Sequence, residues 1–127
     1  MTPERIILID DSEADNFFHE LALKRAGFTG EIKIFQRPEE GVSFLLSDGV
    51  SIPTLLLLDI NMPVLNGFQV AALLTSRLTP TSKFRAMFLT SSNWNEDRTR
   101  AKENSIIEKF LVKPLSKDKA ARLISDF

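Results

Sequence analysis

Three aspartates, a threonine and a lysine each stand at the end of a short apolar run in this chain of 127 residues. Asp10 and Asp11 follow the first run, Asp59 follows the third, and Thr90 and Lys113 close the fourth and fifth. Carboxylates that gather in one place repel one another, and their charge is costly unless a cation lies among them. Magnesium in proteins is bound by a few carboxylates together with water and phosphate oxygens. If the fold brings these run ends together, we expect Asp10 and Asp11 to hold a magnesium ion.

Asp59 has the chemistry of a phosphoryl acceptor in such a site. Its carboxylate can act as a nucleophile and form an aspartyl phosphate, while magnesium neutralises charge on the transferring oxygens. Asp59 itself and the backbone carbonyl of Asn61 would be further metal ligands. The Lys113 ammonium would pair with a second phosphoryl oxygen as a point charge, and the Thr90 hydroxyl would hydrogen-bond a third. A cis peptide bond before Pro114 would direct Lys113 into the site.

The apolar runs must be strands of one sheet if they are to position these residues. The runs are Arg5 to Ile9, Ile32 to Phe35, Thr54 to Leu58, Phe84 to Leu89 and Phe110 to Val112. The first and third are almost continuously apolar, which is typical of strands buried on both faces of a parallel sheet. In an open sheet of that kind, ligands bind beyond the carboxyl ends of the strands. The candidate residues would therefore meet at one edge of the sheet.

Five segments of helical character alternate with the runs. They are Ser12 to Gly27, Pro38 to about Gly49, a segment that follows Asn66-Gly67 and is closed by Pro80, about Asn95 to Glu103, and a last segment from Ser116. Alternating strands and helices predict an α/β fold with a parallel sheet and right-handed crossovers. The length fits one compact domain, so we expect residues 1–127 to form a single domain.

The composition argues against several classes of protein. The chain has no cysteine, which excludes thiolate, disulfide and iron–sulfur chemistry, and the one histidine, His19, cannot form a histidine metal cluster by itself. Sixteen basic and 17 acidic residues give a net charge of −1, without the electrostatic footprint of a nucleic-acid binder. The longest apolar run, Leu55 to Leu58, is far too short to span a bilayer. We therefore expect a soluble cytoplasmic protein that binds neither nucleic acid nor a membrane.

The strand ends also carry a family resemblance. The matching stretches are Ile7 to Asp11, Leu56 to Pro63, Asn66-Gly67, Thr90-Ser91 and Phe110 to Pro114. Any one of them would be weak, but five in order at compatible spacing are highly specific. On these stretches the sequence resembles the response regulator receiver domain of two-component signalling, over nearly the whole chain.

The resemblance implies a fold and a role for each matching residue. The fold would be a doubly wound, flavodoxin-like (βα)5 sandwich of three layers, with strand order 2-1-3-4-5. The implied roles are an acidic pair around magnesium for Asp10 and Asp11, the phosphoacceptor for Asp59, the switch hydroxyl for Thr90, the family's lysine for Lys113 and the switch aromatic for Phe110. Phe110 taken alone is more typical of a core residue than of a switch.

The resemblance further implies a signalling protein rather than an enzyme with a separate substrate. A sensor histidine kinase or a histidine phosphotransfer protein would phosphorylate Asp59, and the domain would assist its own phosphotransfer and autodephosphorylation. Output would pass through protein contacts on the face formed by the fourth helix, fifth strand and fifth helix, a candidate face for a homodimer as well. We expect no output domain, because the sequence ends at Phe127, at the end of the fifth predicted helix.

Two positions leave the lifetime of the phosphate open. Ser91 stands on the access route to the phosphate, where the family most often has alanine. Asn61 lies two residues past Asp59, where the family tunes dephosphorylation.

Two other functions stay open as alternatives. One is a pseudo-receiver, an interaction module that no longer accepts phosphate, although the site residues are intact. The other is an enzyme of the aspartyl-phosphate phosphatase type. That enzyme would need a second aspartate where this chain has Asn61, and a substrate cap for which the chain leaves little room.

Two further residues invite a functional interpretation. Trp94 lies in a polar stretch after the fourth strand, and we expect it to contact a partner or cover the site, the alternative being a ring folded back on the fourth helix. His19 lies beside Phe17 and Phe18 in the first helix, and we expect a surface or half-buried residue rather than a phosphodonor.

Overall fold

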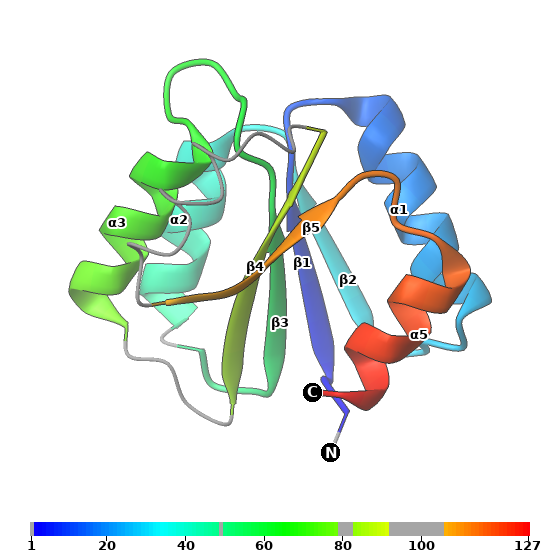
Figure 1. Cartoon of the computed structure of the whole chain (residues 1–127). Helices are drawn as coiled ribbons and strands as arrows, with labels where there is room; N and C mark the ends of the chain where they lie inside the picture. The colour runs from blue at the N-terminus through cyan, green and yellow to red at the C-terminus, as the bar shows by residue number, and fades with distance from the viewer. Residues whose placement is uncertain (1, 49, 79–82, 92–105) are drawn as a thin grey trace.

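The centre of the computed structural model is a parallel sheet of five strands. The strands are β1 (Arg5–Ile9), β2 (Glu31–Phe35), β3 (Thr54–Leu58), β4 (Phe84–Thr90) and β5 (Ile107–Val112). They lie in the order β2-β1-β3-β4-β5 (Figure 1). The structure describes residues 2–48, 50–78, 83–91 and 106–127. The predicted parallel α/β sheet and its strand order are confirmed.

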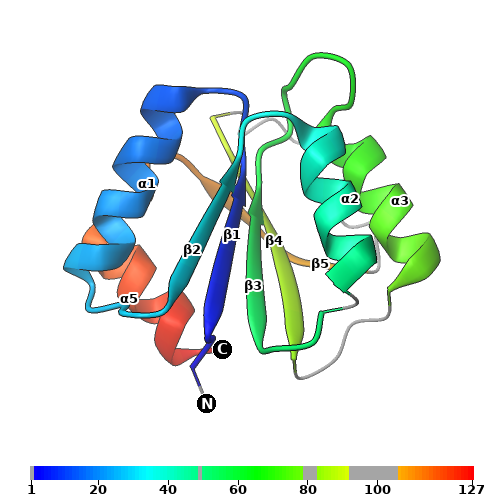
Figure 2. The ribbon, with the colours of Figure 1, turned by 180° about the vertical axis from the view of Figure 1, so that it is seen from behind.

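Helices cover both faces of the sheet. They are α1 (Glu13–Arg25), α2 (Pro38–Asp48), α3 (Gly67–Arg77) and α5 (Lys117–Ser125). Figures 1 and 2 show α1 and α5 on one face and α2 and α3 on the other, which gives the predicted three layers. The predicted fourth helix, from about Asn95 to Glu103, and Trp94 lie outside the described residues. Within the described ranges, no helix is both long and apolar enough to cross a bilayer.

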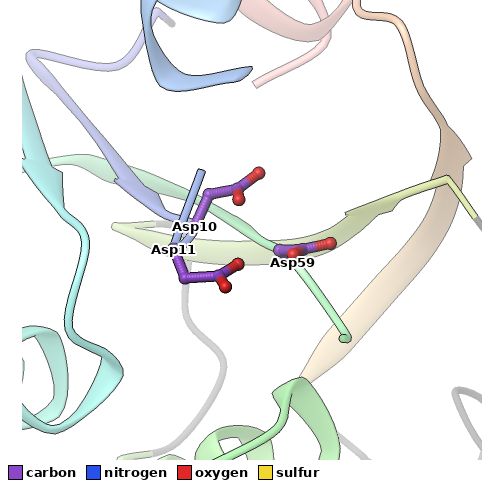
Figure 3. Close-up of side chains that lie close together, drawn as sticks. All are labelled: Asp10, Asp11 and Asp59. Atoms are coloured by element: carbon purple, nitrogen blue, oxygen red, sulfur yellow. The ribbon is translucent and has the colours of Figure 1, made fainter. Parts of the chain in front are cut away.

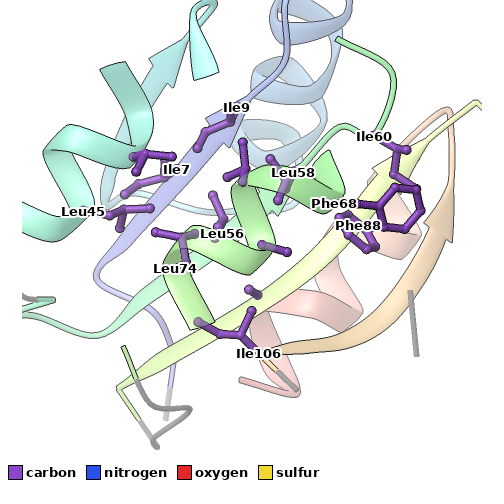
Figure 4. Packing of buried hydrophobic residues seen from close by; sticks show 14 of the residues in the cluster. Ile7, Ile9, Leu45, Leu56, Leu58, Ile60, Phe68, Leu74, Phe88 and Ile106 are labelled. Atoms are coloured by element: carbon purple, nitrogen blue, oxygen red, sulfur yellow. The ribbon is translucent and has the colours of Figure 1, made fainter. Parts of the chain in front are cut away.

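The core consists of two apolar layers, one on each face of the sheet. Alternate residues of β1 divide between them: Ile7 and Ile9 face α2 and α3, whereas Ile6 and Leu8 pack with α1 and α5. Figure 4 shows the first layer, where the rings of Phe68 and Phe88 meet edge to face at 5.3 Å between centroids. Every residue of β1 and β3 is buried, as the continuous apolar runs predict. These two strands therefore form a rigid base for whatever follows them.

β5 is longer than its apolar run. It begins at Ile107, whereas the sequence predicts a start at Phe110. It is the last strand of the sheet, and Glu108 and Lys109 on it are exposed. Glu108 also pairs with Arg85 of β4, at 2.7 Å. A strand at the edge of a sheet accommodates polar residues that a search for apolar runs rejects, which explains the error.

Side-chain caps start three of the helices. Ser12 caps α1 and Ser116 caps α5, each accepting a hydrogen bond from the backbone N–H three residues on. Asn66 caps α3 in a reciprocal capping box with Gln69. After α1, Gly27 has a φ of +99°, which glycine adopts readily. The caps at Ser12 and Ser116 agree with the predicted starts of α1 and α5, whereas α3 begins at Gly67, inside the Asn66-Gly67 pair that the predicted helix follows.

The expectation that His19 lies at or near the surface is wrong. His19 is only 3% exposed, whereas its neighbours Phe17 and Phe18 are each 61% exposed. The side of α1 that faces the sheet carries Asn16, His19 and Leu23, which follow the spacing of one helix face. Burial, and to a lesser extent the Lys113 ammonium, lowers the pKa of His19. His19 is therefore a buried polar residue in the middle of α1, where the charges of Lys113 and Asp10 influence its pKa.

A buried arginine ties the start of β1 to α2. The guanidinium of Arg5 donates to Asp48 Oδ2 at 2.8 Å and to Thr54 Oγ1 at 3.1 Å. It also lies over the ring of Phe44, 5.0 Å from the centroid. The hydrogen bond from Arg5 lowers the pKa of Asp48 below its ordinary value of 3.8. The ionised Asp48 is therefore favoured in the folded protein.

We expect Asp48→Asn to lower the free energy of unfolding by about 1–2 kcal/mol at pH 7, because Arg5 would lose its anion. A carboxyl group whose pKa is depressed by folding stabilises the protein above its unfolded pKa. The difference from wild type should therefore be full above about pH 4 and shrink as the pH falls further. Urea unfolding across pH 2 to 7 measures it, with the exposed Glu31→Gln as control. A difference that does not depend on pH would contradict this explanation.

Candidate functional site

The carboxyl ends of β1 and β3 bring three aspartates together. One carboxylate oxygen from each of Asp10, Asp11 and Asp59 lies within 4.8 Å of the other two. Figure 3 shows the three side chains lying close together just beyond the two strand ends. Asp10 and Asp59 are buried, whereas Asp11 is exposed. The structure thus brings together the acidic residues that the sequence predicts to converge.

The register of the sheet explains this convergence. Ile9 and Leu58 are partners in neighbouring parallel strands, so the residues that follow them emerge side by side. The Asp59 amide donates to the carbonyl of Ile9 at 2.9 Å, which continues the pairing by one residue. The chain leaves β1 toward β2 on one side and returns in β3 on the other side. The aspartates therefore lie at the topological switch point, where sheets of this kind bind ligands.

Lys113 reaches this cluster from the end of β5. Its Nζ lies 2.7 Å from Asp10 Oδ2, 2.6 Å from Asp15 Oδ2 and 3.4 Å from Asp59 Oδ1. The Lys113 amide donates to the carbonyl of Thr90 at 2.7 Å, which fixes the backbone at this point. The peptide bond between Lys113 and Pro114 is cis, as predicted. One ammonium is thus shared among carboxylates from three parts of the chain.

Burial and the neighbouring charges shift the pKa values of both Asp59 and Lys113. Burial, followed by the negative charge of Asp10, raises the pKa of Asp59 to about 6, although Lys113 acts to lower it. Burial disfavours the charge on Lys113, but its hydrogen bonds with Asp10 and Asp15 outweigh that effect and raise the pKa of the lysine. Lys113 therefore stays charged at neutral pH. In the protein without metal, the surroundings of Asp59 disfavour its ionised form.

A comparison with known families settles which family has this arrangement. The model of the response regulator receiver domain matches residues 6–125. The chain belongs to that family. Most of this receiver domain also aligns with the probable methanogenesis regulatory protein FilR2 of Methanothrix harundinacea (strain 6Ac). The two are 29% identical over 130 residues, covering 98% of this chain and 81% of the relative.

Solved structures agree with the family. A response regulator receiver protein from Dyadobacter fermentans DSM 18053 is 29% identical, with a TM-score of 0.82 over 96% of this chain and 95% of that one. A two component response regulator from Cytophaga hutchinsonii has a TM-score of 0.86 over 99% and 97% of the two chains. At 23% identity, the second likeness supports the fold alone.

The receiver domain places its other predicted site residues as follows. Thr90 is buried at the carboxyl end of β4. Phe110 is half-buried in β5, opposite Phe88, and packs against the apolar layer beneath α2 and α3. Asn61 and Ser91 are exposed, and the role of the Asn61 carbonyl as a metal ligand stays a prediction. Trp94 lies outside the described residues.

The first turn of α1 adds site residues that strand ends alone do not reveal. The Ser12 amide donates to Asp10 Oδ1 at 2.9 Å, and the Asn16 side chain donates to the Asp10 carbonyl at 2.8 Å. Asp15 binds Lys113 from the same turn. The strand-end rule misses Asp15 because this residue belongs to a helix. The sequence shows only an acidic residue three positions after the capping Ser12, and its contact with Lys113 depends on the fold.

The start of α3 packs closely against the backbone of Asp59. The Gly67 amide donates to the carbonyl of Ile60 at 2.7 Å. A Cβ atom at Gly67 would collide with the Asp59 carbonyl oxygen and lie 2.7 Å from the Ile60 Cα. Neither of these backbone atoms can rotate away as a side chain can. Glycine at position 67 is therefore required for this approach.

Gly67→Ala should displace the backbone at Asp59 and Ile60, with a loss of about 1–3 kcal/mol in stability. Amide chemical shifts in NMR spectra measure the displacement. Gly30→Ala is the matched control, because its Cβ would lie 2.5 Å from the Glu4 carbonyl oxygen at the opposite edge of the sheet. The control should lose stability and leave the Asp59 signals in place. Unchanged signals at Asp59 and Ile60 in Gly67→Ala would contradict the packing argument.

We expect Asp59→Asn to stabilise the metal-free protein at pH 7.5 by roughly 1–3 kcal/mol. The pKa of Asp59 is raised from 3.8 to about 6, so the folded state binds more protons than the unfolded state between these values. The stability of wild type relative to Asp59→Asn should therefore fall as the pH rises from about 4 to 6, and should stay low above that range.

Urea unfolding in the presence of a chelator tests this expectation, with the exposed Glu31→Gln as control. The advantage of Asp59→Asn should vanish below about pH 4, where the wild-type carboxyl is protonated in both states. A variant less stable than wild type at pH 7.5 would show that the folded protein does not disfavour the ionised form of Asp59.

Proposed function

We propose that this receiver domain accepts a phosphoryl group on Asp59, with Mg²⁺ bound beside it, and signals by a change of conformation. The observation that carries the proposal is the cluster itself. The Asp59 carboxylate lies with those of Asp10 and Asp11 and 3.4 Å from the Lys113 ammonium. Membership of the receiver family supports a signalling role.

The residues present fit a magnesium ion. Asp10, Asp11 and Asp59 offer hard oxygen donors, which magnesium prefers over nitrogen or sulfur. Lys113 supplies one positive charge against these three carboxylates, and it is shared with Asp15 as well. Asp10, Asp11 and Asp59 would hold the ion, with the Asn61 carbonyl as a further ligand. Bound there, magnesium would neutralise charge on the oxygens of the transferring group.

The side chains at the site would have separate roles in phosphoryl transfer. An Asp59 oxygen would form the new bond to phosphorus as the bond to the donor's histidine nitrogen breaks, and that nitrogen keeps the electron pair. The Lys113 ammonium would pair with one phosphoryl oxygen, and the Thr90 hydroxyl would hydrogen-bond another. Hydrolysis of the aspartyl phosphate by water would later restore Asp59. The rate of that step depends on Ser91 and Asn61 in a way that stays open.

Phosphorylation would bias two pre-existing conformations. Thr90 would follow the phosphoryl group at the end of β4. Phe110, which is half-buried in the last strand of the sheet, would follow Thr90, and the pairing of β4 with β5 supports this role. The switch would thus reach the outer face of β5 and α5. A homodimer through that face belongs to the same proposal, as do signalling by residues 1–127 as a single domain and a cytoplasmic location.

The proposed phosphodonor is a sensor histidine kinase or a histidine phosphotransfer protein. Such a partner must approach the carboxyl edge of the sheet, where α1 begins. Phe17 and Phe18 on α1 expose apolar rings 5.8 Å apart, and exposed apolar groups of this kind are typical of a contact surface. The phosphatase alternative has less support, because Asn61 stands where that enzyme needs its second aspartate.

A radiolabelled small phosphodonor tests the proposal without any partner protein. Wild type with Mg²⁺ should take up label that hydroxylamine releases, as expected of an acyl phosphate, and uptake should stop when the metal is chelated. Asp59→Asn should take up none, while Asp118→Asn, an exposed site on α5, should behave as wild type.

Stoichiometric labelling of Asp59→Asn would rule out the assignment. A wild-type protein that neither takes up label nor responds to beryllofluoride, a phosphate mimic, would be a pseudo-receiver instead.

A further inference from the structure

Lys113 is held more closely by Asp15 than by the proposed phosphoacceptor. Its ammonium has three N–H donors. Two of them serve Asp10 at 2.7 Å and Asp15 at 2.6 Å, both within hydrogen-bond range, while Asp59 lies farther away at 3.4 Å. Lys113 is 12% exposed and Asp15 40% exposed, so the pair lies at the border between the buried site and solvent. Asp15 thus draws the lysine toward α1.

The local structure of α1 leaves the Asp15 carboxylate available for this bond. Ser12 caps the helix by accepting from the Asp15 amide at 3.2 Å, which fixes the turn that carries Asp15. An acidic or amide side chain at this position commonly bonds back to the amide of the capping residue, as Gln69 does at the start of α3. In α1 the Ser12 amide already donates to Asp10 Oδ1. Asp15 is therefore free to reach across to Lys113.

We propose that Asp15 is a positioning residue that competes with the phosphoryl group on Asp59 for the Lys113 ammonium. The inference rests on the proposed function of Asp59. Asp15 lies outside the cluster formed by Asp10, Asp11 and Asp59, so its charge acts on the site through Lys113. A phosphoryl group must share or displace this bond to gain the full charge of the lysine. The Asp15–Lys113 bond thus opposes the phosphorylated state.

The competition works in both directions, because coupling between two binding events is reciprocal. Asp15 weakens the hold of Lys113 on a phosphoryl group, and a phosphoryl group weakens the hold of Lys113 on Asp15. Since Lys113 follows β5 and Asp15 belongs to α1, their bond ties the end of β5 to α1. Phosphorylation would loosen this tie.

Beryllofluoride affinity at saturating Mg²⁺, measured by calorimetry or fluorine NMR, tests the inference. Asp15→Asn keeps the shape of the side chain and removes its charge. We expect it to bind beryllofluoride about fivefold more tightly than wild type, the factor expected for one partly exposed ion pair. Asp15→Ala should do the same, and Asp15→Glu should stay close to wild type.

Two controls separate a local from a general effect of charge. Glu13→Gln removes the same charge from the same turn of α1, at an exposed side chain, and should change the affinity by less than about twofold. In a Lys113→Met background, Asp15→Asn should have no effect, because the competition needs the ammonium.

The inference would be overturned by equal gains in Asp15→Asn and Glu13→Gln, which would indicate a general effect of charge. It would also be overturned by weaker binding in folded Asp15→Asn and Asp15→Ala, which would make Asp15 a support for Lys113. Unchanged affinity in both variants, with a wild type that binds, overturns this inference and leaves the proposed function standing. Failure of wild type to bind beryllofluoride overturns both.

Discussion

The meeting of one ammonium with carboxylates from three parts of the chain is the constraint on which the site depends. Lys113 reaches Asp10 beyond β1, Asp15 in α1 and Asp59 beyond β3. Like charges this close are held together only because the backbone beneath them cannot yield. The fully buried β1 and β3 supply that rigidity through two apolar layers, one on each face of the sheet. The packing thus stabilises the fold and also holds the repelling carboxylates close together at the carboxyl ends of β1 and β3.

That electrostatic repulsion supports the proposal that phosphorylation of Asp59 acts beyond the site. Burial and the charge of Asp10 raise the pKa of Asp59, so the metal-free site favours anything that lowers its negative charge. A cation among the aspartates has that effect, and a phosphoryl group on Asp59 would then redistribute the contacts of Lys113. Because a backbone hydrogen bond joins Lys113 to Thr90, such a change would affect the ends of both β4 and β5. The proposed switch therefore needs only local rearrangements of paired strands.

Much of this arrangement could be predicted from the sequence because the decisive signals are local. Continuous apolar runs identify β1 and β3, and the polar residue that ends each run identifies Asp10 and Asp59. Features that depend on tertiary contacts could not be predicted in the same way. The start of β5 at Ile107 follows from its place at the edge of the sheet, and the burial of His19 follows from how α1 is rotated. The role of Asp15 appears only when its distance to Lys113 is known.

The central claim is that the phosphoryl group is carried by Asp59 and by neither of its acidic neighbours. Borohydride reduction converts an aspartyl phosphate into homoserine, which mass spectrometry of peptides can locate in the chain. After treatment with a small phosphodonor and Mg²⁺, homoserine is expected at position 59 and absent from positions 10 and 11. Homoserine at position 10 or 11, or at none of the three in a protein that has taken up label, would contradict the proposed mechanism.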